Sequence, residues 1–286
     1  MAKISPEAKQ RYAEKVKEYK KTAEAIVERE KSILKTLADD DQRGNVHKWI
    51  TLAEDRLNLA SYYLLLNRVS LALLNTRNEG FLNDARKSCY QAIIYLEDVV
   101  TNYLDVPFSE YEDRLELIGQ YKDERRCYLA RKLGFTIQLV QDSFGENSKW
   151  KWSFVELEGR YATVVKNLID LRHVVEGLDP RSPGYESRVA LVALCKARLG
   201  KAADRYRERY ELSTGRIDDF KHAIAFLATL RRIHAWLGEN DDAEQVKKKL
   251  EVWKAKMNSD EQRAEAGAKA AETKARQQGK AQPGRR

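Results

Sequence analysis

The sequence predicts an all-α protein of about eight long helices in an irregular antiparallel hairpin stack, followed by a flexible C-terminal tail. First, 14 glycines and 5 prolines among 286 residues are few for a chain with many turns. Second, 43% hydrophobic and 34% charged residues supply a core beneath strongly solvated helices. Third, apolar residues recur every three or four positions, and no stretch shows the two-residue alternation of a strand.

The first helix is predicted over residues 6–37. Ser5 is a natural N-cap, and Pro6 suits the first helical position. A narrow stripe follows, with the charged Glu30 in one of its positions, and such a stripe can pack against one partner only. We therefore expect either a hairpin with the next helix, which Glu30 favours, or self-association through residues 6–37. The other stripe residues are Tyr12, Val16, Tyr19, Ala23, Ile26, Ile33 and Leu37.

Seven further helices are predicted between breaks in the same spacing. The middle of the second, residues 59–66, is apolar nearly all round and is expected inside the protein. Asn83 can cap the third helix, and Ser109 with Glu112 forms a capping box for the fourth. The expected ranges are about 46–76, 83–104, 109–143, 150–178, 184–212, 217–237 and 241–257.

The composition divides the chain into a helical domain and a tail. Large apolar residues vanish after Met257, where Ala, Gln, Gly, Lys and Glu dominate. Such a segment buries too little apolar surface to repay its ordering entropy. We expect a helical domain over 1–257, with a candidate sub-boundary at the Pro- and Gly-containing break 179–184, and a disordered basic tail over 258–286.

Two turns share the pattern G-x-x-(N/D)-D-A, at residues 80–85 and 238–243. Each follows an apolar helix and precedes an amphipathic one, and Ala92 and Leu250 lie seven residues beyond the alanine. The pattern resembles the inter-helix turn of tetratricopeptide repeats (TPR), with Leu230 at a leucine position of that family. The resemblance covers two hairpins and implies TPR-like helical packing; a generic irregular helical bundle is the alternative.

The cysteines and the apolar runs bear on the compartment. Cys89, Cys127 and Cys195 show neither a CxxC motif nor a zinc spacing, which predicts reduced, buried thiols in a cytoplasmic protein. The N-terminal residues lack the apolar region of a secretory signal. No apolar run approaches the ~18 residues of a transmembrane helix, so we expect no membrane span.

No local motif indicates catalysis. Asp170 with His173, and Asp219 with His222, place a carboxylate three residues before an imidazole, a spacing used in di-metal helix bundles with Glu as the acid. Here the acid is the shorter Asp, and Asp170 and His173 fall on a polar helix face, so we expect no metal site. Phosphate-binding loops, dinucleotide turns and nucleophile elbows are also missing. We therefore expect no cofactor and no enzymatic activity; a helical enzyme without a local motif is the third alternative.

One predicted helix face is basic. Arg198, Lys201, Arg205 and Arg209 follow one another at steps of three, four and four, so they share a face. That face could bind phosphates, acidic lipid head groups or an acidic protein. Local ion pairs, such as Lys201 with Asp204, would instead make it an ordinary solvated surface.

Two tryptophans form the second candidate partner site. On a helix, Trp150 and Trp152 would point about 200° apart, so one core cannot easily hold both. We expect one to be buried and the other to anchor an interface, unless neighbouring helices bury both. The sequence thus predicts a non-enzymatic cytoplasmic scaffold or adaptor that binds another protein, with a nucleic-acid-associated protein as the alternative.

Overall fold

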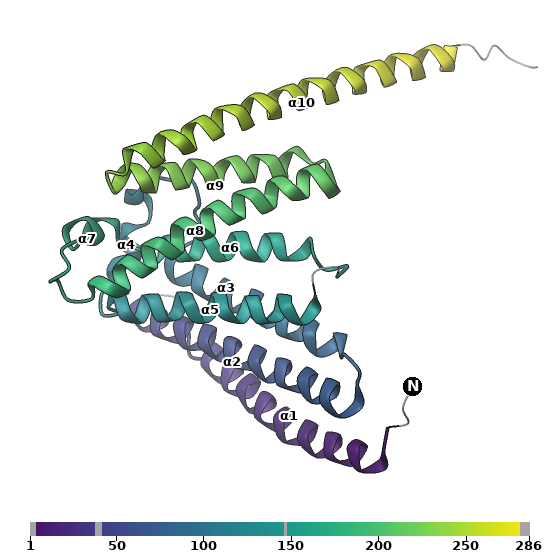
Figure 1. Cartoon of the computed structure of the whole chain (residues 1–286), viewed down its shortest axis with the longest axis vertical. Coiled ribbons are helices and arrows are strands. Elements are labelled where there is room, and N and C mark those ends of the chain that lie inside the picture. Colours follow the sequence, from purple (N-terminus) through teal and green to yellow (C-terminus); the bar gives the residue numbers. More distant parts are fainter. Residues whose placement is uncertain (1–3, 38–41, 146–147, 281–286) are drawn as a thin grey trace, which may run out of the picture. The chain divides into compact units, whose positions relative to one another are not determined.

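The computed structural model describes residues 4–37, 42–145 and 148–280 (Figure 1). Helices make up 83% of the chain, and the described ranges contain no strand, which confirms the all-α prediction. The chain forms two compact units, Met1–Ala202 and Ala203–Arg286, here called the first and second unit.

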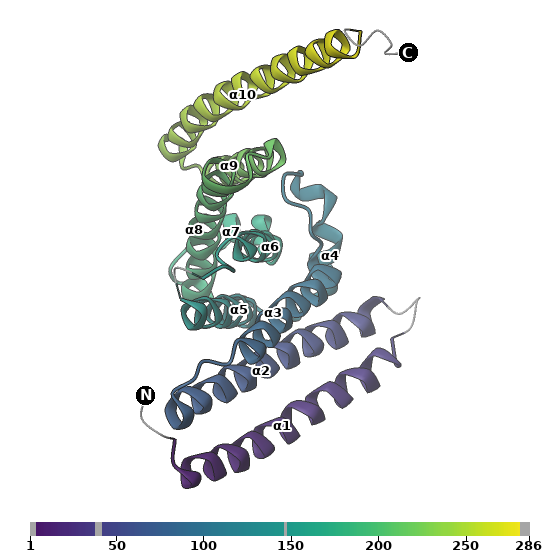
Figure 2. The same ribbon diagram turned by 90° about the vertical axis from the view of Figure 1, so that its right-hand side faces the viewer.

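The first unit is built around the pair α2 and α3. Helix α2 packs against α1, α3, α4 and α5, and α3 also contacts α4, α5 and α6. Figure 2 shows α1 and α2 side by side as an antiparallel hairpin. The α-helices of this unit are α1 (Pro6–Leu34), α2 (Gln42–Leu74), α3 (Glu79–Val100), α4 (Glu112–Leu117), α5 (Asp123–Phe144), α6 (Ser153–Asn167), α7 (Leu171–Glu176) and the first part of α8 (Tyr185–Arg209).

Helix α1 has the predicted cap and the predicted stripe. The Ser5 hydroxyl accepts a hydrogen bond from the Ala8 amide at 3.1 Å. Each stripe position is at least partly covered, while most positions between them are exposed. Glu30 is 4% exposed and accepts hydrogen bonds from Arg56 Nε, at 2.7 Å, and from the Tyr95 hydroxyl. The partner of the stripe within the chain is therefore α2; self-association through residues 6–37 stays a prediction.

Two of the predicted long helices are broken. Residues 109–143 form a short 3₁₀-helix (Phe108–Glu110), α4 and α5, and residues 150–178 contain α6 and α7. The predicted capping box is wrong, because Ser109 lies inside the 3₁₀-helix and no side chain caps α4. The predicted cap of α3 is also displaced, because Asn78 rather than Asn83 accepts the hydrogen bond from the Phe81 amide.

The breaks have a tertiary cause. Arg126 donates from Nε to the Tyr121 carbonyl at 2.8 Å, and from its two terminal nitrogens to the Ile118 and Leu168 carbonyls, each at 3.2 Å. Asn167 Nδ2 donates to the Thr101 carbonyl at 2.9 Å. The guanidinium thus satisfies carbonyls that a continuous helix would have bonded internally.

The predicted break at 179–184 does not separate the two units. The Ser182 hydroxyl donates to the Gly177 carbonyl at 2.9 Å, and Arg188 Nη2 lies 2.7 Å from Asp123 Oδ2 on α5. These contacts tie the break to the first unit, and the division between the units instead falls within α8.

The second unit contains the end of α8, a π-helical turn (Tyr210–Thr214), α9 (Ile217–Trp236) and α10 (Asn240–Lys280). Helices α9 and α10 pack together, with the Phe220 and Trp253 ring centroids 6.0 Å apart. We expected the tail to begin after Met257, but helix α10 continues past this residue. The residues that follow are rich in Ala, Glu, Lys and Gln, which are strong helix formers. Asp260 accepts a hydrogen bond from the Tyr210 hydroxyl at 2.9 Å, so the packed part of α10 extends beyond residue 257.

Helix α2 contains a long apolar segment. Its segment Gly44–Leu74 is the one described helix long and apolar enough to cross a membrane by length and composition. A core helix passes the same test, and α2 packs against four other helices. The segment is therefore weak evidence for a span, and the expected lack of one stays a prediction.

The three cysteines are buried and free. Burial raises the pKa of the Cys89 and Cys195 thiols to about 12. Both side chains are therefore protonated and unreactive in the folded protein at neutral pH.

Candidate functional site

The four predicted basic residues are engaged within their own units. In the first unit, the Arg198 guanidinium lies 5.6 Å from the Tyr161 ring centroid, and Lys201 Nζ lies 2.9 Å from Glu158 Oε1. The carboxylate of that ion pair is the more deeply buried partner, at 10% exposure against 43% for the lysine. The Lys201 charge is thus balanced by a side chain of another helix, α6.

In the second unit, Arg205 Nη1 lies 2.7 Å from Glu208 Oε2, and Arg209 pairs with the buried Asp219. Asp204, the expected partner of Lys201, instead pairs with Lys249 at 2.8 Å. Three of the four predicted cations therefore have a carboxylate partner, and the fourth, Arg198, covers an aromatic ring.

The two tryptophans lie in the turns before α6, not on a helix. Trp150 is half-buried, with Phe144 on one side at 6.2 Å and the Arg86 guanidinium 4.8 Å from its ring centroid. Trp152 is also half-buried, and Lys151 Nζ lies 4.7 Å from its ring centroid. The helical angle that we expected between them does not apply, and both rings are partly covered.

The two Asp-x-x-His pairs have structural partners. Asp170 caps α7 by accepting hydrogen bonds from the backbone amides of Arg172 and His173 at 3.1 and 3.2 Å. Asp219 accepts from Arg209 and, at 2.6 Å, from the Thr214 hydroxyl. Each carboxylate thus satisfies nearby donors of its own region.

A third histidine lies among carboxylates at the α9–α10 turn. His234 Nδ1 lies 2.6 Å from Glu239 Oε2 and 3.9 Å from Asp242 Oδ2, close enough for the three to share a metal ion. However, a histidine in the last turn of one helix and an acid in the first turn of the next are also what the helix dipoles favour. The cluster therefore needs no ion to explain it.

A groove of 610 Å³ runs between α1 and α2 in the first unit. The small side chains of Ala25 and Ser61 let a ligand approach the helix backbones. Ile26, Tyr62 and Leu65 supply apolar surface, and Leu65 is 38% exposed. The lining residues are Thr22, Ala25, Ile26 and Arg29 from α1, and Asn58, Ser61, Tyr62 and Leu65 from α2. We call this the α1–α2 groove.

The outer face of α5 lies next to the α1–α2 groove. Lys132 Nζ donates to Asn58 Oδ1, a groove residue, at 3.0 Å. On the same face of α5, Tyr128 is 51% exposed and Phe135 is 66% exposed. We use the name groove surface for the α1–α2 groove together with Tyr128, Lys132 and Phe135.

Two ion pairs beside the groove surface have the cation as the more exposed partner. Arg29 pairs with Asp55 across α1 and α2, and the arginine side chain is 56% exposed while the aspartate is 4% exposed. Arg125 pairs with Glu54 across α5 and α2 at 2.7 Å, with exposures of 43% and 21%. In both pairs a partner would meet the cation first.

A second hollow, which we call the polar pocket, lies between α4, α5 and α7 and has a volume of 280 Å³. Phe108 and Leu115 give it an apolar wall, and charged side chains of both signs line the rest. The charged members are Glu112, Glu116, Lys122, Asp123, Arg126, Asp170 and Arg172, and His173 also lines the pocket.

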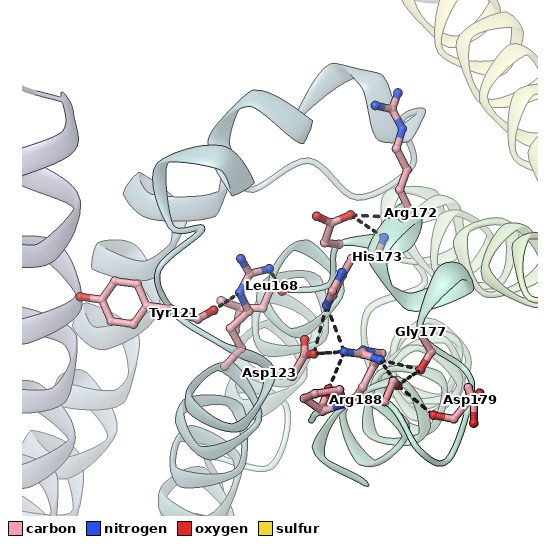
Figure 3. Close-up of polar contacts among 12 residues, drawn as sticks. Tyr121, Asp123, Leu168, Arg172, His173, Gly177, Asp179 and Arg188 are labelled. Carbon is pink, nitrogen blue, oxygen red and sulfur yellow. Dashed lines mark hydrogen bonds and ion pairs between the residues drawn. The ribbon is translucent and has the colours of Figure 1, made fainter. Parts of the chain in front are cut away.

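Beside the polar pocket, Asp123, His173 and Arg188 converge, as Figure 3 shows. Arg188 is 3% exposed and donates to Asp123 Oδ2 from Nε at 3.0 Å and from Nη2 at 2.7 Å. Arg188 Nη2 also lies 3.0 Å from His173 Nε2, and that ring nitrogen is 3.5 Å from Asp123 Oδ2. The network holds α7 and α8 against α5.

Sequence reasoning missed both hollows. The groove surface does leave a signal on α5, because Tyr128 and Phe135 are seven residues apart on the side opposite the buried Leu129 and Leu133. The polar pocket has no such signal in the sequence. Its walls come from residues 109–143 and 150–178, each predicted as one helix but broken in the structure.

The comparisons with known proteins place the chain in a family. Residues 8–261 match the TP0443 family, so the chain belongs to it. Neither a curated protein nor a solved structure matches the chain.

Proposed function

We propose that this member of the TP0443 family is a non-enzymatic, TPR-like helical scaffold or adaptor that binds an acidic amphipathic helix of another protein. The groove surface carries the proposal, because it combines an open groove with exposed aromatic side chains on a neighbouring helix. A helix that lays its apolar face into such a groove is a common mode of peptide recognition.

The size and lining of the α1–α2 groove support a helical ligand. Ala25 and Ser61 leave room between α1 and α2, and Leu65 offers apolar contact there. Beyond the groove, Phe135 extends from α5 and can insert between side chains of the bound helix.

The charge of the surrounding side chains supports an acidic ligand. Arg29 and Arg125 present their guanidinium groups above more deeply buried carboxylates. Lys132 adds a third cation, whose hydrogen-bond partner Asn58 is neutral. Acidic residues flanking the apolar face of the ligand would meet these groups and speed association.

The cytoplasmic location belongs to the same proposal. Three free and buried cysteines suit a reducing compartment. Nucleic-acid binding by the face of Arg198, Lys201, Arg205 and Arg209 has less support, because the ion-paired side chains of Arg205 and Arg209 are only 19% and 17% exposed.

The experiment introduces a photo-crosslinking amino acid at Ser61 in the full-length chain, inside cells that contain the protein naturally. A crosslinked partner segment is then purified, and its affinity is measured with wild type, Phe135→Asp and Val252→Asp. Val252 is 67% exposed, which matches the 66% of Phe135, but it lies on α10 in the second unit. Neither substitution should change the circular dichroism spectrum.

We expect Phe135→Asp to weaken binding of an acidic helical segment at least tenfold, the loss of about 1.4 kcal/mol that a contact residue of an interface can cost, and Val252→Asp to leave it unchanged. Equal affinities for both variants would refute the groove surface as the binding site. Crosslinks to a second copy of this chain alone would replace the proposed partner by self-association.

A further inference from the structure

We propose that the polar pocket binds a small oxyanion, a carboxylate or a phosphate group, through Arg126 and Lys122. This site is separate from the groove surface and does not depend on it. The inference rests on the volume of the pocket, on the burial of one guanidinium in its wall, and on how the neighbouring charges are paired.

Arg126 supplies the first argument. It lines the polar pocket and is 8% exposed, and its three hydrogen bonds in the described structure all go to backbone carbonyls. Arginine has five N–H groups, so two of them have no partner among the described residues. No carboxylate of the described residues lies within 4.0 Å of this guanidinium, although buried charges are normally paired.

The carboxylates nearest to Arg126 do not fully offset the unfavourable effect of burial on its positive charge. Asp170 and Asp123 favour the charged guanidinium, yet burial outweighs them and lowers the pKa of Arg126. A ligand with negative charge in the pocket would supply the missing stabilisation.

Most of the other charges of the pocket already have a partner among the described residues. Glu112 pairs with Arg172 at 2.8 Å, Asp123 pairs with Arg188, and Asp170 caps α7. Among the described lining residues, Lys122 has no ion-pair or hydrogen-bond partner for its ammonium group, and it lies next to the first turn of α5. Two cations, Lys122 and Arg126, and two acids, the exposed Glu116 and the α7 cap Asp170, therefore have no ion-pair partner among the described residues.

The size of the pocket limits the ligand. A volume of 280 Å³ is near the lower end for small-molecule sites, so it suits a ligand of few heavy atoms. Two free N–H groups on Arg126 can bind two oxygens, and planar guanidinium groups recognise both carboxylates and phosphates in this way.

The test titrates the full-length chain with inorganic phosphate and, separately, with succinate, while sodium chloride keeps the ionic strength constant. Thermal unfolding measures stabilisation, and the proton resonances of the four histidines report the location. His173 lines the pocket, and its signal is identified by its loss in His173→Gln. Phosphate and succinate distinguish the two kinds of oxyanion.

We expect a saturable shift of the His173 signal with at least one anion. Lys122→Gln should weaken this binding about fivefold or more, and Lys9→Gln, at an exposed site on α1, should not change it. Arg126→Gln should abolish binding. Arg126 also binds the carbonyls at the ends of α4 and α6, so the Arg126→Gln variant can fail to fold. In that case the comparison of Lys122→Gln with wild type decides the test. The proposal is wrong if neither anion shifts the signal saturably, or if Lys122→Gln and Lys9→Gln bind as wild type does.

Discussion

Glu30→Ala should destabilise the first unit strongly, although it removes a charge from the middle of an apolar stripe. The Glu30 side chain accepts hydrogen bonds from Arg56 Nε at 2.7 Å and from the Tyr95 hydroxyl, so it joins α1 to both α2 and α3. Alanine leaves the guanidinium and the phenol without this acceptor. Since burial and Glu30 together raise the pKa of Tyr95 to about 12, its hydroxyl stays protonated and needs an acceptor throughout the neutral range.

The size of the effect follows from burial. Removing one partner of a buried ion pair costs about 3–5 kcal/mol, because the other charge stays buried. Arg56 is 25% exposed and can regain part of its hydration, so we expect a cost at the lower end, about 3 kcal/mol. For a unit of this size that corresponds to a fall of about 6–12 °C in melting temperature.

Replacing the whole network distinguishes a lost contact from lost packing. Glu30→Leu combined with Arg56→Met and Tyr95→Phe removes all three polar groups, and apolar replacement of a buried ion pair is often neutral or stabilising. We therefore expect the triple variant to be more stable than Glu30→Ala by about 2 kcal/mol or more.

The assay is urea unfolding, monitored by circular dichroism and by tryptophan fluorescence. Trp49 reports on the network because its ring centroid lies 5.4 Å from that of Tyr95. Glu28→Ala is the matched control on the same helix. Its ion pair with Lys31 is exposed at both ends, and its loss should leave the midpoint of urea unfolding nearly unchanged. A cost below about 1 kcal/mol for Glu30→Ala, or a triple variant no more stable than the single one, would refute the reasoning.

Two further predictions concern the break at 177–184 and the end of α10. A Cβ at residue 177 would overlap the guanidinium of Arg188, so Gly177→Ala should lower the free energy of unfolding by about 2 kcal/mol; an unchanged melting temperature would contradict it. Deleting residues 258–286 removes Asp260, which accepts a hydrogen bond from the π-helical turn, and should lower the melting temperature of the second unit. Deleting 267–286 instead should leave it unchanged, and equal melting temperatures for the two truncated chains would show that this contact contributes nothing.

The sequence predicts helices well where one face decides burial. The stripe of α1 lies against α2 because its three- and four-residue steps determine which side chains point the same way. The breaks before α5 and before α7 escape this reasoning. At the second break, Asn167, Leu168 and Asp170 include neither glycine nor proline, and the chain turns because Arg126 and Thr101 take part in distant hydrogen bonds. Such bonds join residues far apart in the sequence, so no local pattern can reveal them.

The predicted binding residues show a similar limit. The spacing of Lys201, Arg205 and Arg209 correctly places them on one helix, but spacing cannot show that Glu158 and Asp219 lie across from two of them. In a chain with 34% charged residues, a cation on one helix can find a carboxylate on a neighbouring helix once the helices pack. In such a protein a run of basic residues is weak evidence for a binding face.

Exposed aromatic residues carry more information in this chain. A single exposed apolar side chain is ordinary, but α5 presents Tyr128 and Phe135 on one face while Leu129 and Leu133 on another face lie in the core. The Arg125 guanidinium lies 5.5 Å from the Tyr128 ring centroid and Lys132 Nζ lies 6.0 Å from it. We expect these cations to disfavour the pairing of two such faces by repulsion. An acidic partner would remove that repulsion, so the same cations would favour the acidic ligand that we propose.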